Sequence, residues 1–183
     1  MKQFPFPDRI FARSELSRDV LYKKIPQAVH EQICDDAWQV GAAAAQTLLT
    51  EHPNCSIDEI AKQDSLEIVR EKTDKISAGY RFFGEYIPKK NCIYMYLLSI
   101  RLFAEENNLT NGEAEEFIFA HEYFHFLEEK RIGTVSRRYT VPRFSLGFLK
   151  IGSSGITALS EIGAHGFART YWEAHKGIVK EIL

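Results

Sequence analysis

The chain has 183 residues with a formal net charge of −2 at pH 7, and 45% of its residues are hydrophobic. This length suits one domain, and the balance of apolar and charged residues is that of a globular protein rather than a disordered one. The charge argues against a dedicated nucleic-acid-binding protein, and no apolar run approaches the roughly 18 residues of a membrane span. Three cysteines without a C-x-x-C pair, and no secretory signal, predict a cytoplasmic protein with reduced thiols.

Proline positions and apolar periodicity predict an arm and two helices at the start of the chain. Residues 1–25 are mixed in character and broken by prolines, so we expect a packed arm or a short helix there. Between residues 26 and 50, apolar side chains recur every three or four residues, as on one face of a helix. Ser56 and Glu59 then have the spacing of a capping box, which predicts a second, short helix.

Three β-prone segments follow and predict a small antiparallel sheet. Residues 66–70 alternate between apolar and polar, residues 79–86 are rich in aromatic side chains, and residues 92–98 read CIYMYLL. Tyr94 and Tyr96 share one face of the last strand. They would line a substrate groove if this strand were the sheet edge, and packing within the sheet is the alternative interpretation.

The second half of the chain is predicted to be mainly helical. Thr110 and Glu113 form another capping box, at the head of a helix that extends to about Arg131. Another long helix is expected over residues 156–175, and residues 134–153 between them are expected to form a loop with partial structure. Because no repeat or linker interrupts this order, the sequence predicts a single α+β domain over the whole chain.

The strongest chemical signal is H-E-Y-F-H at residues 121–125, an H-E-x-x-H motif within a predicted helix. His121 and His125 are four residues apart, so their rings lie on one helix face and can reach one metal ion. Glu122 points about 100° away from His121, which suits a general base that acts on a water molecule at the ion. Chance is the alternative, but such a motif should arise only about once in 50 to 100 random chains of this composition.

A catalytic zinc site has three protein ligands and one open position, so a third ligand must come from elsewhere. The metzincin extension is absent, because Glu128 and Arg131 stand where that motif has glycine and histidine. No aspartate follows His125, and Glu128 and Glu129 are expected to face solvent. The remaining candidates are Glu161, His165, Glu173, His175 and Glu181.

Glu161 is the preferred third ligand. Small residues surround it and would let its helix approach the motif helix closely; they are Gly163, Ala164 and Ala168. The alternative is a solvated charge on a helix surface. His165 follows four residues later on the same face, so it is a reserve ligand or a hydrogen-bonding partner of a ligand.

Two segments, FIFAHEYFHFL and SEIGAHGFA, resemble the ImmA/IrrE family of zinc metallopeptidases. In that family an H-E-x-x-H helix is followed by a helix with the pattern E-x-x-A-x-x-F-A, which Glu161, Ala164, Phe167 and Ala168 match here. SIDEIAKQDSLEIV and NCIYMY also resemble the family's upstream elements, so the resemblance covers about residues 30–172. Tyr123 and Phe124 replace the Leu-Gly of many relatives and are expected to fill core, and residues 169–172 depart from the family pattern.

The resemblance implies a zincin-like fold of the gluzincin type, in which a small, mainly antiparallel sheet packs on helices that include the motif helix. It implies His121, His125 and Glu161 as ligands of one zinc ion per chain, with Glu122 as the catalytic base. The implied activity is hydrolysis of peptide bonds in a protein substrate, for example a transcriptional repressor on which the enzyme acts in trans. The alternatives are a zinc-bearing module that regulates a partner without cutting it and, third, a purely structural zinc clamp.

A peptidase also needs a hydrogen-bond donor for the oxyanion that forms during the reaction. Proximity in sequence to the two motifs suggests Arg137, Arg138, Tyr139 and His165. Together with Arg143, these arginines could instead dock an acidic partner segment or form ordinary solvated surface. His30 and His52 have no partner at ligand spacing, so both are expected on the surface.

Overall fold

The protein's structure, a computed structural model, describes residues 5, 7–53, 55–146 and 149–182. Its helices are α1 (Ala12–Ser17), α2 (His30–Glu51), α3 (Ile57–Gln63), α4 (Leu97–Glu106), α5 (Asn111–Leu127) and α6 (Thr157–Ile182). Its strands are β1 (Glu67–Glu71), β2 (Lys75–Ser77), β3 (Tyr80–Phe82), β4 (Gly84–Ile87), β5 (Cys92–Tyr96), β6 (Thr140–Leu146) and β7 (Leu149–Gly155). The expected α+β class is confirmed. None of the described helices combines the length and the apolar character that crossing a membrane requires.

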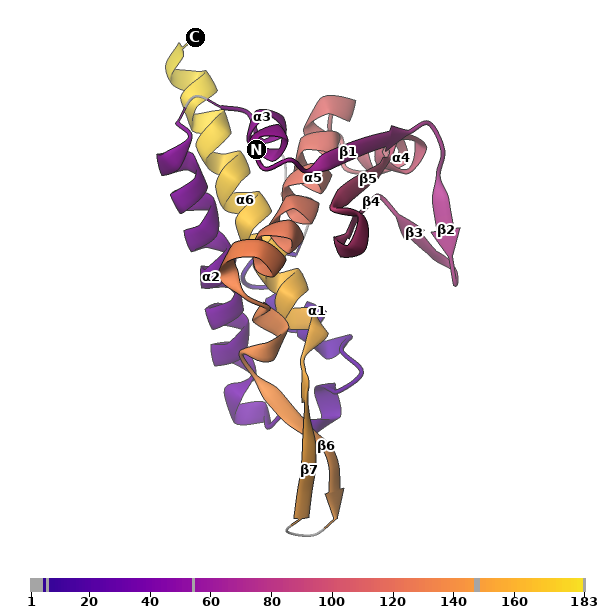
Figure 1. The fold of residues 1–183 in the computed structure, drawn as a ribbon, viewed down its shortest axis with the longest axis vertical. Helices are drawn as coiled ribbons and strands as arrows, with labels where there is room; N and C mark the ends of the chain where they lie inside the picture. Colours follow the sequence, from indigo (N-terminus) through magenta and orange to yellow (C-terminus); the bar gives the residue numbers. More distant parts are fainter. Residues whose placement is uncertain (1–4, 6, 54, 147–148, 183) are drawn as a thin grey trace.

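Three long helices form the body of the molecule (Figure 1). α6 lies between α2 and α5 and packs against both, while α1 contacts α2 and α6. The sheet of β1, β5 and β4 lies on the other side of α5, which contacts β4 and β5. Because α5 is covered from several directions, its aromatic side chains are buried around much of the helix, as at Phe117, Phe119 and Phe124.

Glycines allow α2 and α6 to approach each other closely. A Cβ atom on Gly41 would lie 1.8 Å from the carbonyl oxygen of Gly163, and one on Gly166 would lie 2.5 Å from the carbonyl oxygen of Trp38. The small residues of α6 thus serve its contact with α2 as much as its contact with the motif helix. Gly163 does both, since a Cβ there would also lie 2.9 Å from the ring of Phe124 on α5.

The central sheet is mixed rather than antiparallel. Its strand order is β1-β5-β4; β5 runs parallel to β1 and antiparallel to β4, and the two smaller sheets, β2-β3 and β6-β7, are antiparallel. The chain reverses twice between β1 and β5, once at the β2–β3 turn and once before β5, so β5 returns in the direction of β1. β5 is therefore the central strand and not the edge strand that the groove hypothesis for Tyr94 and Tyr96 required; the two edge strands are β1 and β4.

Local sequence signals predict several helices correctly. Both capping boxes are present, with each Ser or Thr side chain accepting from the Glu backbone and each Glu side chain accepting in return, at α3 and α5. The N-terminal arm contains α1, whose Ala12 and Leu16 are buried. The expected strand over 92–98 ends at Tyr96, because Leu97 already begins α4, a helix that the apolar run alone does not distinguish from a longer strand.

Residues 134–153 contain more regular structure than a loop. β6 and β7 pair from Thr140 opposite Gly155 to Leu146 opposite Leu149, and this hairpin projects from the helical body (Figure 1). α6 continues beyond the expected end at residue 175 and reaches Ile182.

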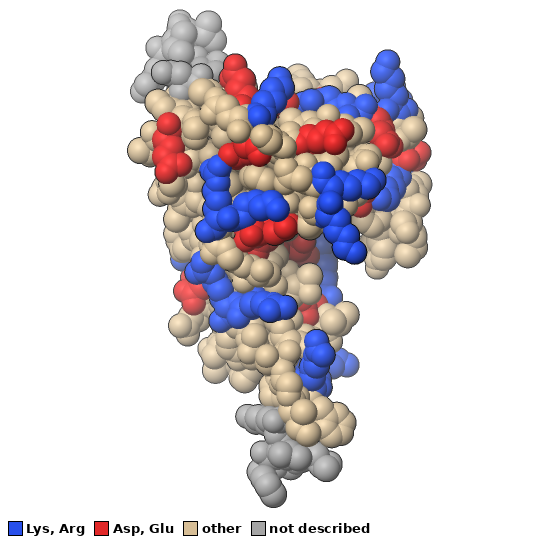
Figure 2. All heavy atoms as spheres, viewed as in Figure 1, with Lys and Arg blue, Asp and Glu red and all other residues tan. Residues whose placement is uncertain are grey.

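The two isolated histidines differ in their surroundings. His30 is only 4% exposed, and its Nε2 lies 3.0 Å from the carbonyl oxygen of Ile25, so the prediction of a surface position is wrong for this residue. His52 is partly exposed. On the face shown in Figure 2, basic and acidic side chains are interspersed, so no broad surface of one sign covers it.

Candidate metal centre

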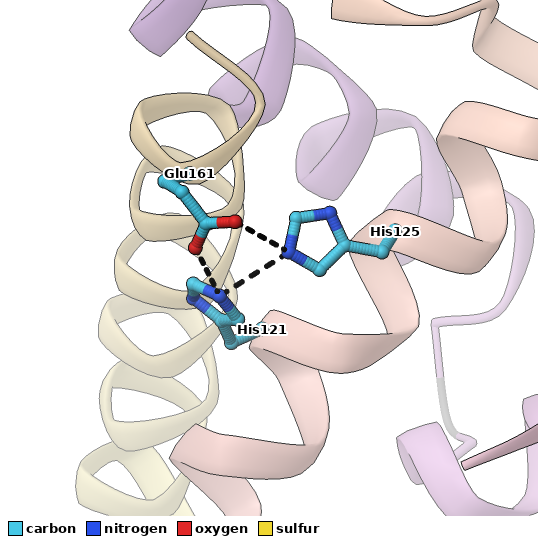
Figure 3. A group of neighbouring side chains, drawn as sticks. All are labelled: His121, His125 and Glu161. Carbon is cyan, nitrogen blue, oxygen red and sulfur yellow. Dashed lines mark hydrogen bonds and ion pairs between the residues drawn. The ribbon is translucent and has the colours of Figure 1, made fainter. Parts of the chain in front are cut away.

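Side chains from α5 and α6 converge on one point (Figure 3). His121 Nε2 lies 3.2 Å from Glu161 Oε2, and His125 Nε2 lies 3.6 Å from Glu161 Oε1. The two Nε2 atoms are 3.3 Å apart. The structure thus brings together the three residues that the resemblance to metallopeptidases implies as ligands.

These three residues could hold a metal ion. Around a tetrahedral zinc ion with bonds of about 2.0–2.1 Å, neighbouring donor atoms lie about 3.3–3.4 Å apart. The two Nε2 atoms here are 3.3 Å apart, and they lie 3.2 and 3.6 Å from the two different oxygens of Glu161, so each of these separations is close to that value. Two imidazoles and one carboxylate leave a fourth position open, as in catalytic zinc sites, although the same donors also suit other divalent metals.

The metal-ligand candidates line a cleft of about 340 Å³ between α5, α6 and the strand segment around β4. Glu122 lines the same cleft. Its Oε2 accepts a hydrogen bond from the backbone N–H of Tyr86 at 2.9 Å. The other lining residues are Arg81, Phe82, Phe83, Gly84, Glu85 and Ile118.

One wall of the cleft is the edge strand β4. The backbone N–H of Tyr96 donates to the carbonyl of Phe83, so in the alternating antiparallel ladder Gly84 and Tyr86 direct their backbone groups away from β5. Gly84 lets the strand lie close to α5, because a Cβ there would be 2.9 Å from Glu122 Cγ. An extended peptide could pair with this edge.

Glu128 is buried, contrary to the prediction that it faces solvent. It begins a π-helical turn over Glu128–Ile132 directly after α5, and it is 6% exposed. Its Oε2 lies 3.0 Å from Nδ1 of His125, and its Oε1 accepts hydrogen bonds from the backbone of Val135 and the hydroxyl of Ser160. The one signal for this contact in the sequence is that Glu128 follows His125 by three residues, a spacing that places both side chains on one helix face. Glu129 is exposed, as predicted.

The charges of the site follow from these contacts. Burial opposes protonation of His125, but the hydrogen bond that its ring donates to Glu128 and the charge of Glu161 outweigh this effect and raise the pKa of His125 to about 9. Burial acts to raise the pKa of Glu161, but its hydrogen bond with His121 and the neighbouring imidazoles hold that pKa at about 2. In the metal-free protein at neutral pH, Glu161 is therefore ionised and His125 is protonated.

His165 is buried beside the three-residue group, with its ring centroid 5.1 Å from that of His121. Burial, together with the charge of His121, lowers the pKa of His165 to about 3, so this ring is neutral at pH 7. Glu173 pairs with Arg169 at 2.8 Å instead of approaching the group. Two ligand candidates remain, His175 and Glu181; the structure describes their helical backbone but not their side chains.

The other oxyanion candidates lie elsewhere. Arg138 and Tyr139 line a second, smaller cleft of about 150 Å³, together with Val29, Asp36 and Leu159. Neither residue lines the cleft that contains Glu122, and Arg137 does not line it either. Of the four candidates, His165 is the one that the structure places against a metal-ligand candidate.

Comparisons of the chain with protein-family models, with curated proteins and with solved structures found no match in any of the three. A conclusion about function therefore depends on the chemistry of the site itself.

Proposed function

We propose that this protein is a zinc-dependent peptidase that hydrolyses peptide bonds within a protein substrate. The observation that carries the proposal is the convergence of two imidazole Nε2 atoms, 3.3 Å apart, with the carboxylate of Glu161, whose two oxygens lie 3.2 and 3.6 Å from them. This group borders a cleft that Glu122 also lines. The motif order agrees with it, since an H-E-x-x-H helix is followed by a helix that supplies a glutamate. That order is also the basis of the resemblance to the ImmA/IrrE family and of a zincin-like fold of the gluzincin type.

In this proposal His121, His125 and Glu161 hold the metal. A bound zinc ion would supply Lewis acidity, which polarises a carbonyl group and lowers the pKa of water. Glu122 takes a proton from the attacking water and delivers it to the departing amine nitrogen. The edge of β4 holds the substrate in an extended conformation next to Glu122.

The substrate in this proposal is a protein, because an edge strand pairs with the backbone of a peptide rather than with one particular side chain. The resemblance to the ImmA/IrrE family extends the proposal to a transcriptional repressor encoded separately from this chain.

Two measurements test the proposal. The first is metal content after purification without chelator: we expect about one zinc per chain in the wild type and much less in Glu161→Gln. The second is cleavage of a peptide library made from a digested proteome, read by mass spectrometry. Glu122→Gln should keep its zinc and lose cleavage, whereas the control Glu129→Gln, an exposed carboxylate beyond the motif, should retain both.

Different failures have different meanings. A wild-type protein that takes up no metal, even after zinc is added, would overturn the metal site and the peptidase together. Zinc uptake that depends on Glu161, without cleavage of any peptide by the wild type, would favour the regulatory module that binds a partner without cutting it.

A further inference from the structure

We infer that Glu128 is a positioning residue of the metal site: it fixes the ring of His125 and connects the two helices that carry the ligands. This inference rests on the proposed metal site and adds a residue to it. Glu128 touches neither the open position nor the cleft, so its effect must act through His125 and the α5–α6 contact.

The first contact sets the orientation of an imidazole. Glu128 Oε2 lies 3.0 Å from His125 Nδ1, and a carboxylate oxygen accepts the proton that this nitrogen carries. With its proton on Nδ1, a neutral His125 has its lone pair on Nε2, the atom that faces Glu161 and His121. A carboxylate behind a ligating histidine also raises the basicity of the ring toward a metal.

The second carboxylate oxygen of Glu128, Oε1, accepts hydrogen bonds from two other donors. Glu128 Oε1 accepts the backbone N–H of Val135 at 2.7 Å and the hydroxyl of Ser160 at 2.8 Å. The hydroxyl of Ser160 in turn accepts the N–H of Ser136 at 3.2 Å, so its own proton points at Glu128. Both oxygens must therefore accept, which a glutamine amide cannot do because its NH₂ group would face one of these donors.

The same contacts join the two ligand-bearing helices. Ser160 directly precedes Glu161 on α6, and Glu128 directly follows α5. The buried carboxylate of Glu128 thus connects His125 on α5 with Ser160, the residue before Glu161 on α6. The π-helical turn that begins at Glu128 is a rare local geometry that occurs often at functional sites.

The test compares zinc affinity, measured by competition with a chromophoric chelator, and the visible absorption spectrum after Co²⁺ is bound. The variants are the wild type, Glu128→Gln and the control Glu129→Gln, which removes one charge from the same turn. We expect Glu128→Gln to bind zinc about 10- to 100-fold more weakly, with an altered Co²⁺ spectrum, and the control to match the wild type. Equal affinity and an unchanged spectrum in Glu128→Gln would overturn the inference, even if its thermal stability fell.

A second variant decides the matter if Glu128→Gln fails to fold. Ser160→Ala removes one donor to Glu128 and keeps the carboxylate. In the zinc-loaded protein, nuclear magnetic resonance should show a slowly exchanging Nδ1 proton on His125 in the wild type and faster exchange in Ser160→Ala. Identical exchange and affinity would overturn the inference, whereas a wild type that binds no zinc would instead mean that the proposed function fails.

Discussion

The protonation state of His125 determines how this site responds to pH. Its pKa of about 9 in the metal-free protein means that both ring nitrogens carry a proton at neutral pH. A metal must therefore displace the proton on Nε2 of His125 before it can bind both histidines through that atom. Glu161, with a pKa of about 2, stays ionised and needs no deprotonation. Zinc affinity should therefore rise as the pH rises toward 9 and fall as the pH falls.

Calorimetry of zinc binding measures this effect directly. At pH 6, well below the range in which water at a zinc ion titrates, repeated titrations in buffers of different ionisation enthalpy should report release of about one proton or more per zinc. Zinc binding without proton release at this pH would contradict the assignment of a protonated His125.

The sequence predicts the site unevenly at the scale of single residues. His121, Glu122 and His125 follow from helix geometry alone, since their relation depends only on positions within one helix. Glu161 needed a second motif, because its approach depends on how α5 and α6 pack. Glu128 was missed because its burial depends on contacts with residues 7 and 32 positions away, which no local pattern reports.

At the scale of elements, the placement of β4 controls what Glu122 can reach. Gly84→Ala introduces a Cβ that would lie 2.9 Å from both Glu122 Cγ and Ile118 Cγ2, so the strand must move away from α5. The hydrogen bond from Tyr86 to Glu122 would then lengthen, while the three metal-ligand candidates on α5 and α6 stay in place.

We expect Gly84→Ala to keep its zinc and to lower kcat/KM on a cleaved peptide about 10- to 100-fold, because small misplacements at a reacting centre are costly. Gly112→Ala is the matched control, since a Cβ at Gly112 meets nothing within 4 Å. Loss of zinc from Gly84→Ala, or full activity in it, would contradict this account of the strand.

Elements with local signals were predicted, and those that depend on distant contacts were not. Capping boxes mark α3 and α5 because their hydrogen bonds join residues three apart. The parallel pairing of β1 with β5 was missed because it depends on two reversals of the chain between them. α4 was missed because an apolar run next to a strand has no period that separates a helix from more strand.

At the scale of the whole molecule, the metal-ligand candidates lie at the contact between α5 and α6, two of the three long helices. α6 joins α2 on one side to α5 on the other, and α5 carries the contacts with the sheet. A metal bound by His121, His125 and Glu161 would therefore cross-link two central helices rather than a surface loop. Such a cross-link stabilises the folded chain as a whole, because the ligands are not arranged in this way in the unfolded chain.

Thermal unfolding tests this cross-link. With free zinc about 100-fold above Kd, binding to the folded state stabilises it by about 2.7 kcal/mol, which for a domain of this size raises Tm by roughly 5 to 10 °C. Glu161→Gln should lose most of this rise, and a chelator should reverse it in the wild type. His52→Gln is the control, since it removes a partly exposed histidine that lies outside the three-residue group. A rise of the same size in Glu161→Gln would show that zinc stabilises the protein from another position, and the cross-link between α5 and α6 would be wrong.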